Sequence, residues 1–248
     1  MKIIEVVSMR RAGHHAFANW LVSNLLGTDG GSGYCEYKFN IIDSGNILWI
    51  NEAEINYDKA QNIISEIKPK YLVITYEVFQ HTTSLEDNPT IKVDLSSLVT
   101  TPELIKEWGV TDIKQITFVR EFWNNFSSLF NLYPFYSEEY SKLEVQAWLR
   151  YYKLLVRSAL ETNGIVFDKW IQNETYSDKA LRDILGIERK VNPLSTKGTY
   201  SSFGDTTPAV NSLLNRRSQV VFPKWFLDIV EQDDELAKLL IKLQILIN

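Results

Sequence analysis

The chain of 248 residues has little cysteine, little net charge and no long apolar run, and each shortage excludes a class of protein. With Cys35 as its single cysteine, no disulfide forms within the chain, which fits a reducing compartment. A formal net charge of −5 argues against a general nucleic-acid binder. No apolar run approaches the roughly 18 residues of a membrane span, and no basic-then-apolar leader opens the sequence. We therefore expect a soluble, cytoplasmic protein without nucleic-acid or membrane partners.

The sequence also lacks the motif GxxxxGK[ST] of the nucleoside triphosphatases. In that motif a lysine reaches the terminal phosphates and a hydroxyl group ligates magnesium. Its absence argues against an enzyme that hydrolyses ATP or GTP. No obvious cluster of carboxylates indicates a metal site, so we expect no metal.

Hydrophobic residues make up 45% of the chain and aromatic residues 12%, as in a globular protein of one domain spanning residues 1–248. Apolar, strand-like runs alternate with segments of helical periodicity, which predicts an α/β fold of three layers, with a central parallel sheet and helices on both of its faces. The expected strands are residues 2–7, 34–39, 47–50, 71–76, 114–119 and 165–167, and the expected helices are 16–26, 57–67, 121–130, 143–160, 179–185 and 225–247.

The first predicted strand is followed by a short loop, residues 8–15, and then by a helix. Backbone N–H groups in such a loop and at a helix N-terminus carry partial positive charge, so they bind anions without a metal. Arg11 adds a planar guanidinium group suited to phosphate or sulfate oxygens. The alternative is a tight turn whose arginines face water.

A second cation follows another predicted strand. Arg120 comes directly after residues 114–119, and Ser128 lies eight residues later, two turns into the next helix. In an open α/β sheet, ligands bind at the carboxyl edge of the strands. The guanidinium and hydroxyl groups are therefore candidates for holding a second anionic group.

In order and spacing, these segments resemble the sulfotransferases that use 3′-phosphoadenosine 5′-phosphosulfate (PAPS). The first loop resembles the family's element for the 5′-phosphosulfate, although two histidines replace the usual hydroxyl pair. The strand with Arg120 and Ser128 resembles the element for the 3′-phosphate. A third, weaker likeness, to an element near that phosphate, lies at Thr196-Lys197-Gly198 and Gly204-Asp205. In the first loop, the residues that carry the resemblance are Arg10, Arg11, Ala12, Gly13, His14 and His15.

This resemblance implies a P-loop-containing, sulfotransferase-like nucleotide-binding fold. It also implies transfer of a sulfuryl group from PAPS to a hydroxyl group of a small molecule or saccharide, with 3′,5′-adenosine bisphosphate (PAP) as product. Arg11 would stabilise the departing oxygen, with Arg10 as a weaker second. The backbone amides of Ala12, Gly13 and His14 would hold the 5′-phosphate, while Lys197 with Gly198 would lie near the 3′-phosphate.

An acceptor hydroxyl needs a general base. By the same resemblance the base is Glu77, directly after the strand 71–76, unless that carboxylate is merely solvated; His81 and His15 are the other candidates. Two other functions stay open: a non-catalytic nucleotide- or anion-binding protein of the same fold, and a small-molecule kinase, which the missing Gly-Lys pair opposes. The sequence predicts neither the acceptor nor the oligomeric state.

Overall fold

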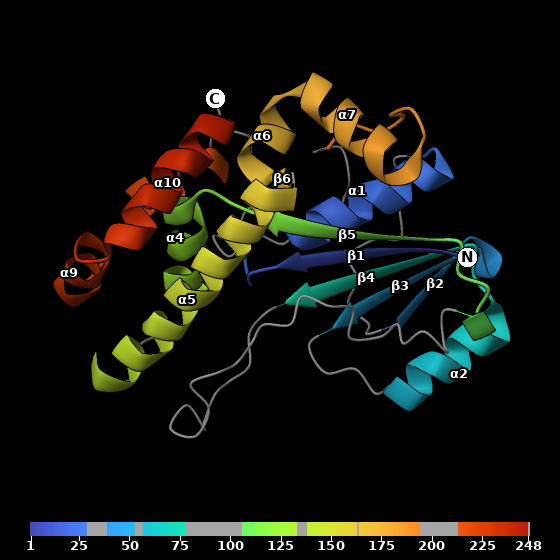
Figure 1. Cartoon of the computed structure of the whole chain (residues 1–248), viewed down its shortest axis with the longest axis horizontal. Helices are drawn as coiled ribbons and strands as arrows, with labels where there is room; N and C mark the ends of the chain where they lie inside the picture. The colour runs from blue at the N-terminus through green and yellow to red at the C-terminus, as the bar shows by residue number, and fades with distance from the viewer. Residues whose placement is uncertain are drawn as a thin grey trace.

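The computed structural model describes residues 1–28, 39–52, 57–77, 106–132, 138–162, 164–193 and 213–247, without the side chains of residues 51, 52, 57, 58, 77 and 138–140. A single six-stranded sheet lies at the centre, with helices around it (Figure 1). In chain order the elements are β1 (Lys2–Ser8), α1 (His14–Leu26), β2 (Phe39–Ile42), η1 (Asp43–Gly45), β3 (Ile47–Glu52), α2 (Tyr57–Ile67), β4 (Tyr71–Glu77), β5 (Asp112–Val119), α4 (Phe122–Leu132), α5 (Glu138–Thr162), β6 (Ile165–Val166), α6 (Phe167–Gln172), α7 (Glu174–Leu185), η2 (Arg216–Gln219), α9 (Lys224–Glu231) and α10 (Asp234–Ile247).

The strands lie in the order β2-β3-β4-β1-β5-β6. Five of them run parallel, as predicted, but β2 pairs antiparallel with β3 at the edge of the sheet. The prediction of an all-parallel sheet is therefore wrong at this edge. Only the three-residue turn η1 separates β2 from β3, and a parallel pair needs a crossover of a dozen or more residues.

The order of the strands reverses at β1. After β1 the chain continues to β3 and β4 on one side, and then crosses to β5 and β6 on the other. In open α/β sheets the crevice at such a reversal is where ligands bind, at the carboxyl ends of the strands. The loops that leave β1 and β5 therefore define the region in which a site is expected.

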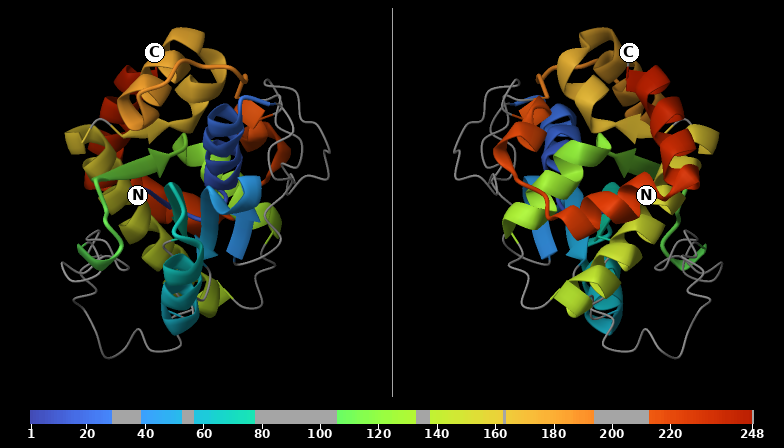
Figure 2. Two further views of the ribbon diagram at one scale, coloured as in Figure 1. Left: turned by 90° about the vertical axis from the view of Figure 1, so that its right-hand side faces the viewer. Right: turned by 90° about the vertical axis from the view of Figure 1, so that its left-hand side faces the viewer.

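Both faces of the sheet are covered, so the fold has the three layers that the sequence predicts. Ile3 and Val7 of β1 belong to a buried core with side chains of α2, α4, α5 and α10. Ile4 and Val6 point to the opposite face and pack in a second core, with α1, α6 and α7. Figure 1 shows α1 and α7 above the sheet and α2 below it, and Figure 2 shows the helices around the sheet from two sides.

The predicted C-terminal helix is in fact two helices, α9 and α10. The break falls at Gln232 and Asp233. There Asp233 Oδ1 accepts a hydrogen bond from the backbone N–H of Leu236 (2.9 Å), while Lys153 Nζ donates to Oδ2 (2.7 Å). A side-chain acceptor at a helix N-terminus starts a new helix, because it satisfies an N–H group that lacks a partner within the helix.

The predicted helix 57–67 coincides with α2, and α4 begins one residue later than predicted, while α1, α5 and α7 begin earlier. Strand β6 ends at Val166 because Phe167 begins α6. In the part of the chain that the structure covers, no helix combines the length and the apolar character that a membrane crossing requires. Residues 82–101 and 194–208 lie outside the described residues, as does most of the predicted strand 34–39.

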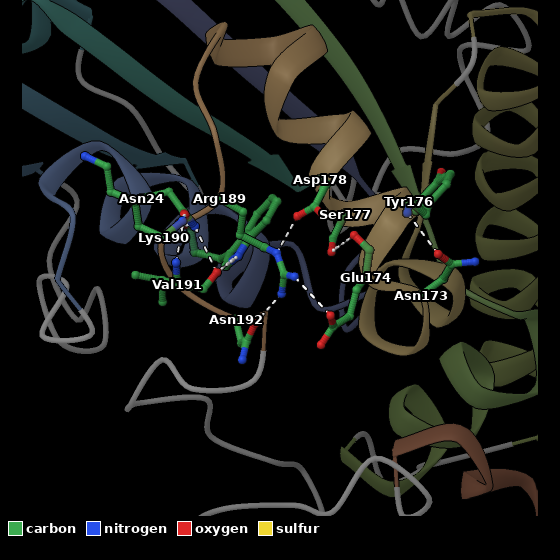
Figure 3. A network of polar contacts seen from close by, with 11 residues as sticks. Asn24, Asn173, Glu174, Tyr176, Ser177, Asp178, Arg189, Lys190, Val191 and Asn192 are labelled. Atoms are coloured by element: carbon green, nitrogen blue, oxygen red, sulfur yellow. Dashed lines mark hydrogen bonds and ion pairs between the residues drawn. The ribbon is translucent and has the colours of Figure 1, made fainter.

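The chain that leaves α7 is fixed to α1 by a polar network (Figure 3). The side chain of Asn24 accepts hydrogen bonds from the backbone N–H groups of Lys190 (2.7 Å) and Val191 (3.0 Å), and Trp20 Nε1 donates to the Val191 carbonyl (2.7 Å). Arg189 Nε donates to Asp178 Oδ1 (2.5 Å) beside it. These contacts fix the starting point of the segment that carries Lys197 and Gly198.

Candidate anion-binding site

The loop after β1 makes a tight turn with two residues in left-handed conformations. The backbone N–H of Ala12 donates to the Met9 carbonyl (3.2 Å), and φ is 65° at Arg11 and 94° at Gly13. A left-handed conformation strains any residue with a side chain, so the turn holds Arg11 in a backbone conformation that costs free energy. At Gly13 the conformation and the space both require glycine, because a Cβ atom would lie 2.6 Å from Cε2 of Phe167.

Helix α1 begins directly behind this turn, with Gly13 as its N-cap. The first N–H groups of a helix have no acceptor inside it and carry partial positive charge. Glycine supplies no capping side chain, and the first turn holds no acidic residue. The helix end therefore suits an anion, with Arg10 and Arg11 half-buried beside it. Of the three amides expected to hold the 5′-phosphate, that of Ala12 is already donated within the turn.

The two histidines of the loop differ in their surroundings. His14 is 2% exposed, and its ring centroid lies 4.1 Å from that of His15, which is half-buried. Burial lowers the pKa of His14 well below its usual value of 6.5, and the nearby positive charges of His15, Arg11 and Arg10 lower it further. At neutral pH His14 is thus an uncharged imidazole and brings no positive charge to an anion.

Arg120 follows β5 directly and reaches back to the first loop. Its Nη1 donates to the Arg11 carbonyl (3.3 Å) and to Ser128 Oγ (3.3 Å), and its Nη2 donates to the Leu213 carbonyl (2.5 Å). The structure therefore brings together the two arginines and the serine that the sequence singles out. Residues 11, 120 and 213, widely separated along the chain, meet at the carboxyl edge of β1 and β5.

Arg120 is 3% exposed, and its guanidinium carbon lies 4.7 Å from the centre of the Phe167 ring. Burial lowers its pKa to about 10, an effect that Asp168 opposes and Arg216 adds to. A guanidinium has five N–H groups, and three of these are donated to the protein acceptors given above. Within the described part of the chain, Nε has no hydrogen-bond partner although it is buried. This arginine thus retains donors for a ligand.

Asn124, which the sequence analysis missed, joins three segments around Arg120. Its Nδ2 donates to the Leu214 carbonyl (2.9 Å), and its Oδ1 accepts from the backbone N–H of Arg216 (2.9 Å). The same Nδ2 lies 3.4 Å from Oδ1 of Asp168, whose Oδ2 accepts from the backbone N–H of Glu121 (2.7 Å). Asp168 is 2% exposed, and burial raises its pKa.

One signal in the sequence points to this network. Asn124 and Asn125 stand side by side in an apolar helix, where asparagine is unfavourable unless its side chain has a partner. Asn125 Nδ2 indeed donates to the Arg10 carbonyl (2.9 Å) and so fixes the first loop to α4. Phe167, Asp168 and Arg216 carry no comparable signal.

The remaining candidates are placed only in part. Glu77 is the last residue of β4 and pairs with Ser8, so its backbone lies at the same edge of the sheet as the first loop; its side chain is outside the described atoms. His81, Lys197 and Gly198 lie outside the described residues.

The chain matches no protein-family model, no curated protein and no solved structure. Among the residues that the structure describes, no group of three or more His, Cys, Asp or Glu side chains could hold a metal ion.

Proposed function

We propose that this chain is a sulfotransferase that moves a sulfuryl group from PAPS to an acceptor hydroxyl. The observation that supports it is the meeting of Arg11 and Arg120, joined through the Nη1–carbonyl hydrogen bond of 3.3 Å, where the loops after β1 and β5 leave the sheet. That position is the strand-order reversal, the usual ligand site of an open α/β sheet.

PAPS carries anionic groups at both ends of its ribose, and the site has donors of two kinds to match them. The N-terminus of α1 with Arg10 and Arg11 suits the 5′-phosphosulfate. The buried Nε–H of Arg120, with Ser128 beside it, suits the 3′-phosphate. Because Nη1 and one N–H of Nη2 are donated to protein oxygens, a phosphate would approach Arg120 from its Nε side.

PAPS supplies the sulfuryl group and departs as PAP. Arg11 and the positive end of α1 would stabilise the negative charge that grows on the departing oxygen, and electrostatic stabilisation of this kind is usually the largest part of catalysis. Glu77 would take the proton of the acceptor hydroxyl, since its backbone lies beside Ser8 at the same edge. His15, half-buried in the loop itself, is the alternative base.

A calorimetric titration with PAP tests the nucleotide site. We expect micromolar binding that Arg11→Ala weakens about tenfold or more, the loss of one charge-assisted hydrogen bond to a phosphate. Arg182→Ala, an exposed arginine on α7, is the control and should bind as the wild type does. Absence of PAP binding overturns the proposal, and tighter binding of ATP with magnesium favours the kinase instead.

A second candidate is a non-catalytic nucleotide-binding protein, favoured by one observation: Arg120 donates three hydrogen bonds to protein oxygens and so also supports the fold. An assay of sulfuryl transfer from PAPS to a panel of hydroxyl acceptors separates the two. The sulfotransferase is expected to label at least one acceptor, with a large loss in Glu77→Gln. Tight PAP binding with no labelled acceptor supports the non-catalytic protein.

A further inference from the structure

Three of the buried polar atoms that lack a hydrogen-bond partner within the described chain lie at the edge of the sheet where β1 and β5 end. Ser8 Oγ belongs to the last residue of β1, Arg120 Nε follows β5, and Asn125 Oδ1 comes from α4. Ser8 and Asn125 are 0% exposed and Arg120 is 3% exposed. Because buried polar groups in folded proteins nearly always have a partner, such atoms at a site point to a ligand.

The carboxamide of Asn125 is fixed against the first loop. Its Nδ2 donates to the Arg10 carbonyl (2.9 Å), and only the nitrogen end of an amide can donate, so Nδ2 and Oδ1 cannot exchange places. Oδ1 is bonded to the same carbon as Nδ2 and therefore lies beside the same loop. An amide oxygen only accepts, so it needs an N–H or O–H group as its partner.

Asn125 and Arg120 contact consecutive residues of that loop. Arg120 Nη1 donates to the carbonyl of Arg11 (3.3 Å), next to the Arg10 carbonyl that Asn125 contacts. The same Nη1 donates to Ser128 Oγ (3.3 Å), and residues three apart in a helix are neighbours, so Ser128 and Asn125 share one side of α4. The donor at Arg120 Nε and the acceptor at Asn125 Oδ1 thus belong to one group of contacts.

An anion alone would satisfy only part of this group. A phosphate or sulfate accepts from the Nε–H of Arg120, but a fully ionised anion has no proton to donate to Asn125. The Ser8 hydroxyl can donate or accept, so it does not discriminate between ligands. A ligand that suits both Arg120 and Asn125 carries a hydroxyl group next to its anionic group. In PAP the one free hydroxyl is on C2′ of the ribose, adjacent to the 3′-phosphate.

We infer that Asn125 Oδ1 accepts a hydrogen bond from the 2′-hydroxyl of the ribose, and that this contact makes the site specific for ribonucleotides. The inference rests on the proposed function for the identity of the nucleotide. Arg120 and Ser128 hold the 3′-phosphate, and Asn125, one turn earlier on α4, meets the hydroxyl group on the neighbouring carbon. A nucleotide without this hydroxyl leaves the buried oxygen without a donor, which is how a polar site rejects an analogue.

Calorimetric titration of the whole chain with PAP and with its 2′-deoxy analogue tests this contact. We expect the wild type to bind PAP at least about fivefold more tightly than the analogue, and Asn125→Ala to bind the two within about twofold of each other. Asn125→Ala also loses the bond to the Arg10 carbonyl, but that loss weakens both nucleotides alike, so the ratio of the two affinities isolates the 2′-hydroxyl. Asn131→Ala, at the exposed end of α4, is the matched control and should keep the preference of the wild type.

The other outcomes separate the inference from the proposed function. A wild type that binds PAP without preferring it to the analogue overturns the inference and leaves the proposed function standing. A preference that survives in Asn125→Ala also overturns the inference, because Asn125 would then only support the loop. If Asn125→Ala does not fold, Asn125→Leu decides by the same ratio, since leucine has a similar shape and no acceptor. A wild type that binds neither nucleotide overturns the proposed function and the inference with it.

Discussion

Gly13 and Phe167 are in such close contact that a Cβ atom at position 13 would lie 2.6 Å from Cε2 of the ring. Gly13→Ala combines this overlap with a left-handed φ of 94°, so Phe167 must move, and with it the surface on which Arg120 stacks. We expect a loss of about 2–4 kcal/mol in the free energy of unfolding, measured with urea, together with weaker PAP binding.

Gly186→Ala is the control for that variant. Gly186 also has a left-handed φ, 71°, but a Cβ atom there would meet nothing within 4 Å. It should therefore show only the conformational strain, about 1 kcal/mol. Equal losses in the two variants would contradict a role for the contact with Phe167.

The buried His14 makes stability depend on pH. Its pKa in the folded protein is well below 6.5, so below about pH 6.5 the unfolded chain takes up a proton that the folded protein does not. The free energy of unfolding should then fall with decreasing pH by about 1.4 kcal/mol per unit from this group. The carboxyl groups of Glu121 and Asp168, with raised pKa values, act in the opposite direction at lower pH.

Urea unfolding of the wild type and His14→Gln between pH 7.5 and 5.5 isolates this effect. The difference in the free energy of unfolding between the wild type and the variant should change with pH, because the variant has no group at position 14 to protonate. If the free energy of unfolding depends on pH in the same way for the wild type and His14→Gln, then the pKa of His14 does not differ between the folded and the unfolded chain.

The hydroxyl of Tyr152 supports the turn at Arg120. It donates to the Arg120 carbonyl (2.8 Å), and burial raises its pKa well above the usual 10, so the hydroxyl keeps its proton in alkaline solution. Tyr152→Phe leaves that carbonyl without its donor and should reduce the free energy of unfolding by about 1–3 kcal/mol. Tyr151→Phe, at the half-buried neighbouring position, should change it by less than about 0.5 kcal/mol. Chemical denaturation measures both.

Asn24 joins α1 to the chain that leaves α7 through bonds to Lys190 and Val191 (Figure 3). Asn24→Ala leaves the part-buried N–H of Lys190 and the buried N–H of Val191 without acceptors, which should reduce the free energy of unfolding by about 2–3 kcal/mol. The exposed Asn192→Ala is the control, expected within about 0.5 kcal/mol of the wild type. A similar loss in both variants would mean that burial of Asn24 does not matter.

Much of the fold follows from the sequence because its signals are local. Apolar runs predict β1, β4 and β5, and the position of Arg120 after a strand suffices to place it at the carboxyl edge. The direction of β2 was not predicted, since it depends on the shortness of η1. The break between α9 and α10 was also missed, although residues 231–235 are five consecutive polar residues and include the capping Asp233.

The site was predictable only where it lies next to a strand. Arg11 and Arg120 have such positions, but the burial of Arg216 and of Asp168 depends on packing between segments far apart in the chain. Phe167 is similar: its contact with Gly13 arises only once β6 and β1 share a sheet. No periodicity in one sequence records such contacts.

The hydrogen bond from Arg120 to the Leu213 carbonyl has a consequence for biosynthesis. Residue 11 leaves the ribosome early, and residue 213 leaves it only after most of the domain has emerged. Until then the loop after β1 and Arg120 lack their contact with the segment at Leu213. Nascent chains that stop before residue 213 should therefore lack the acceptor for Arg120 Nη2.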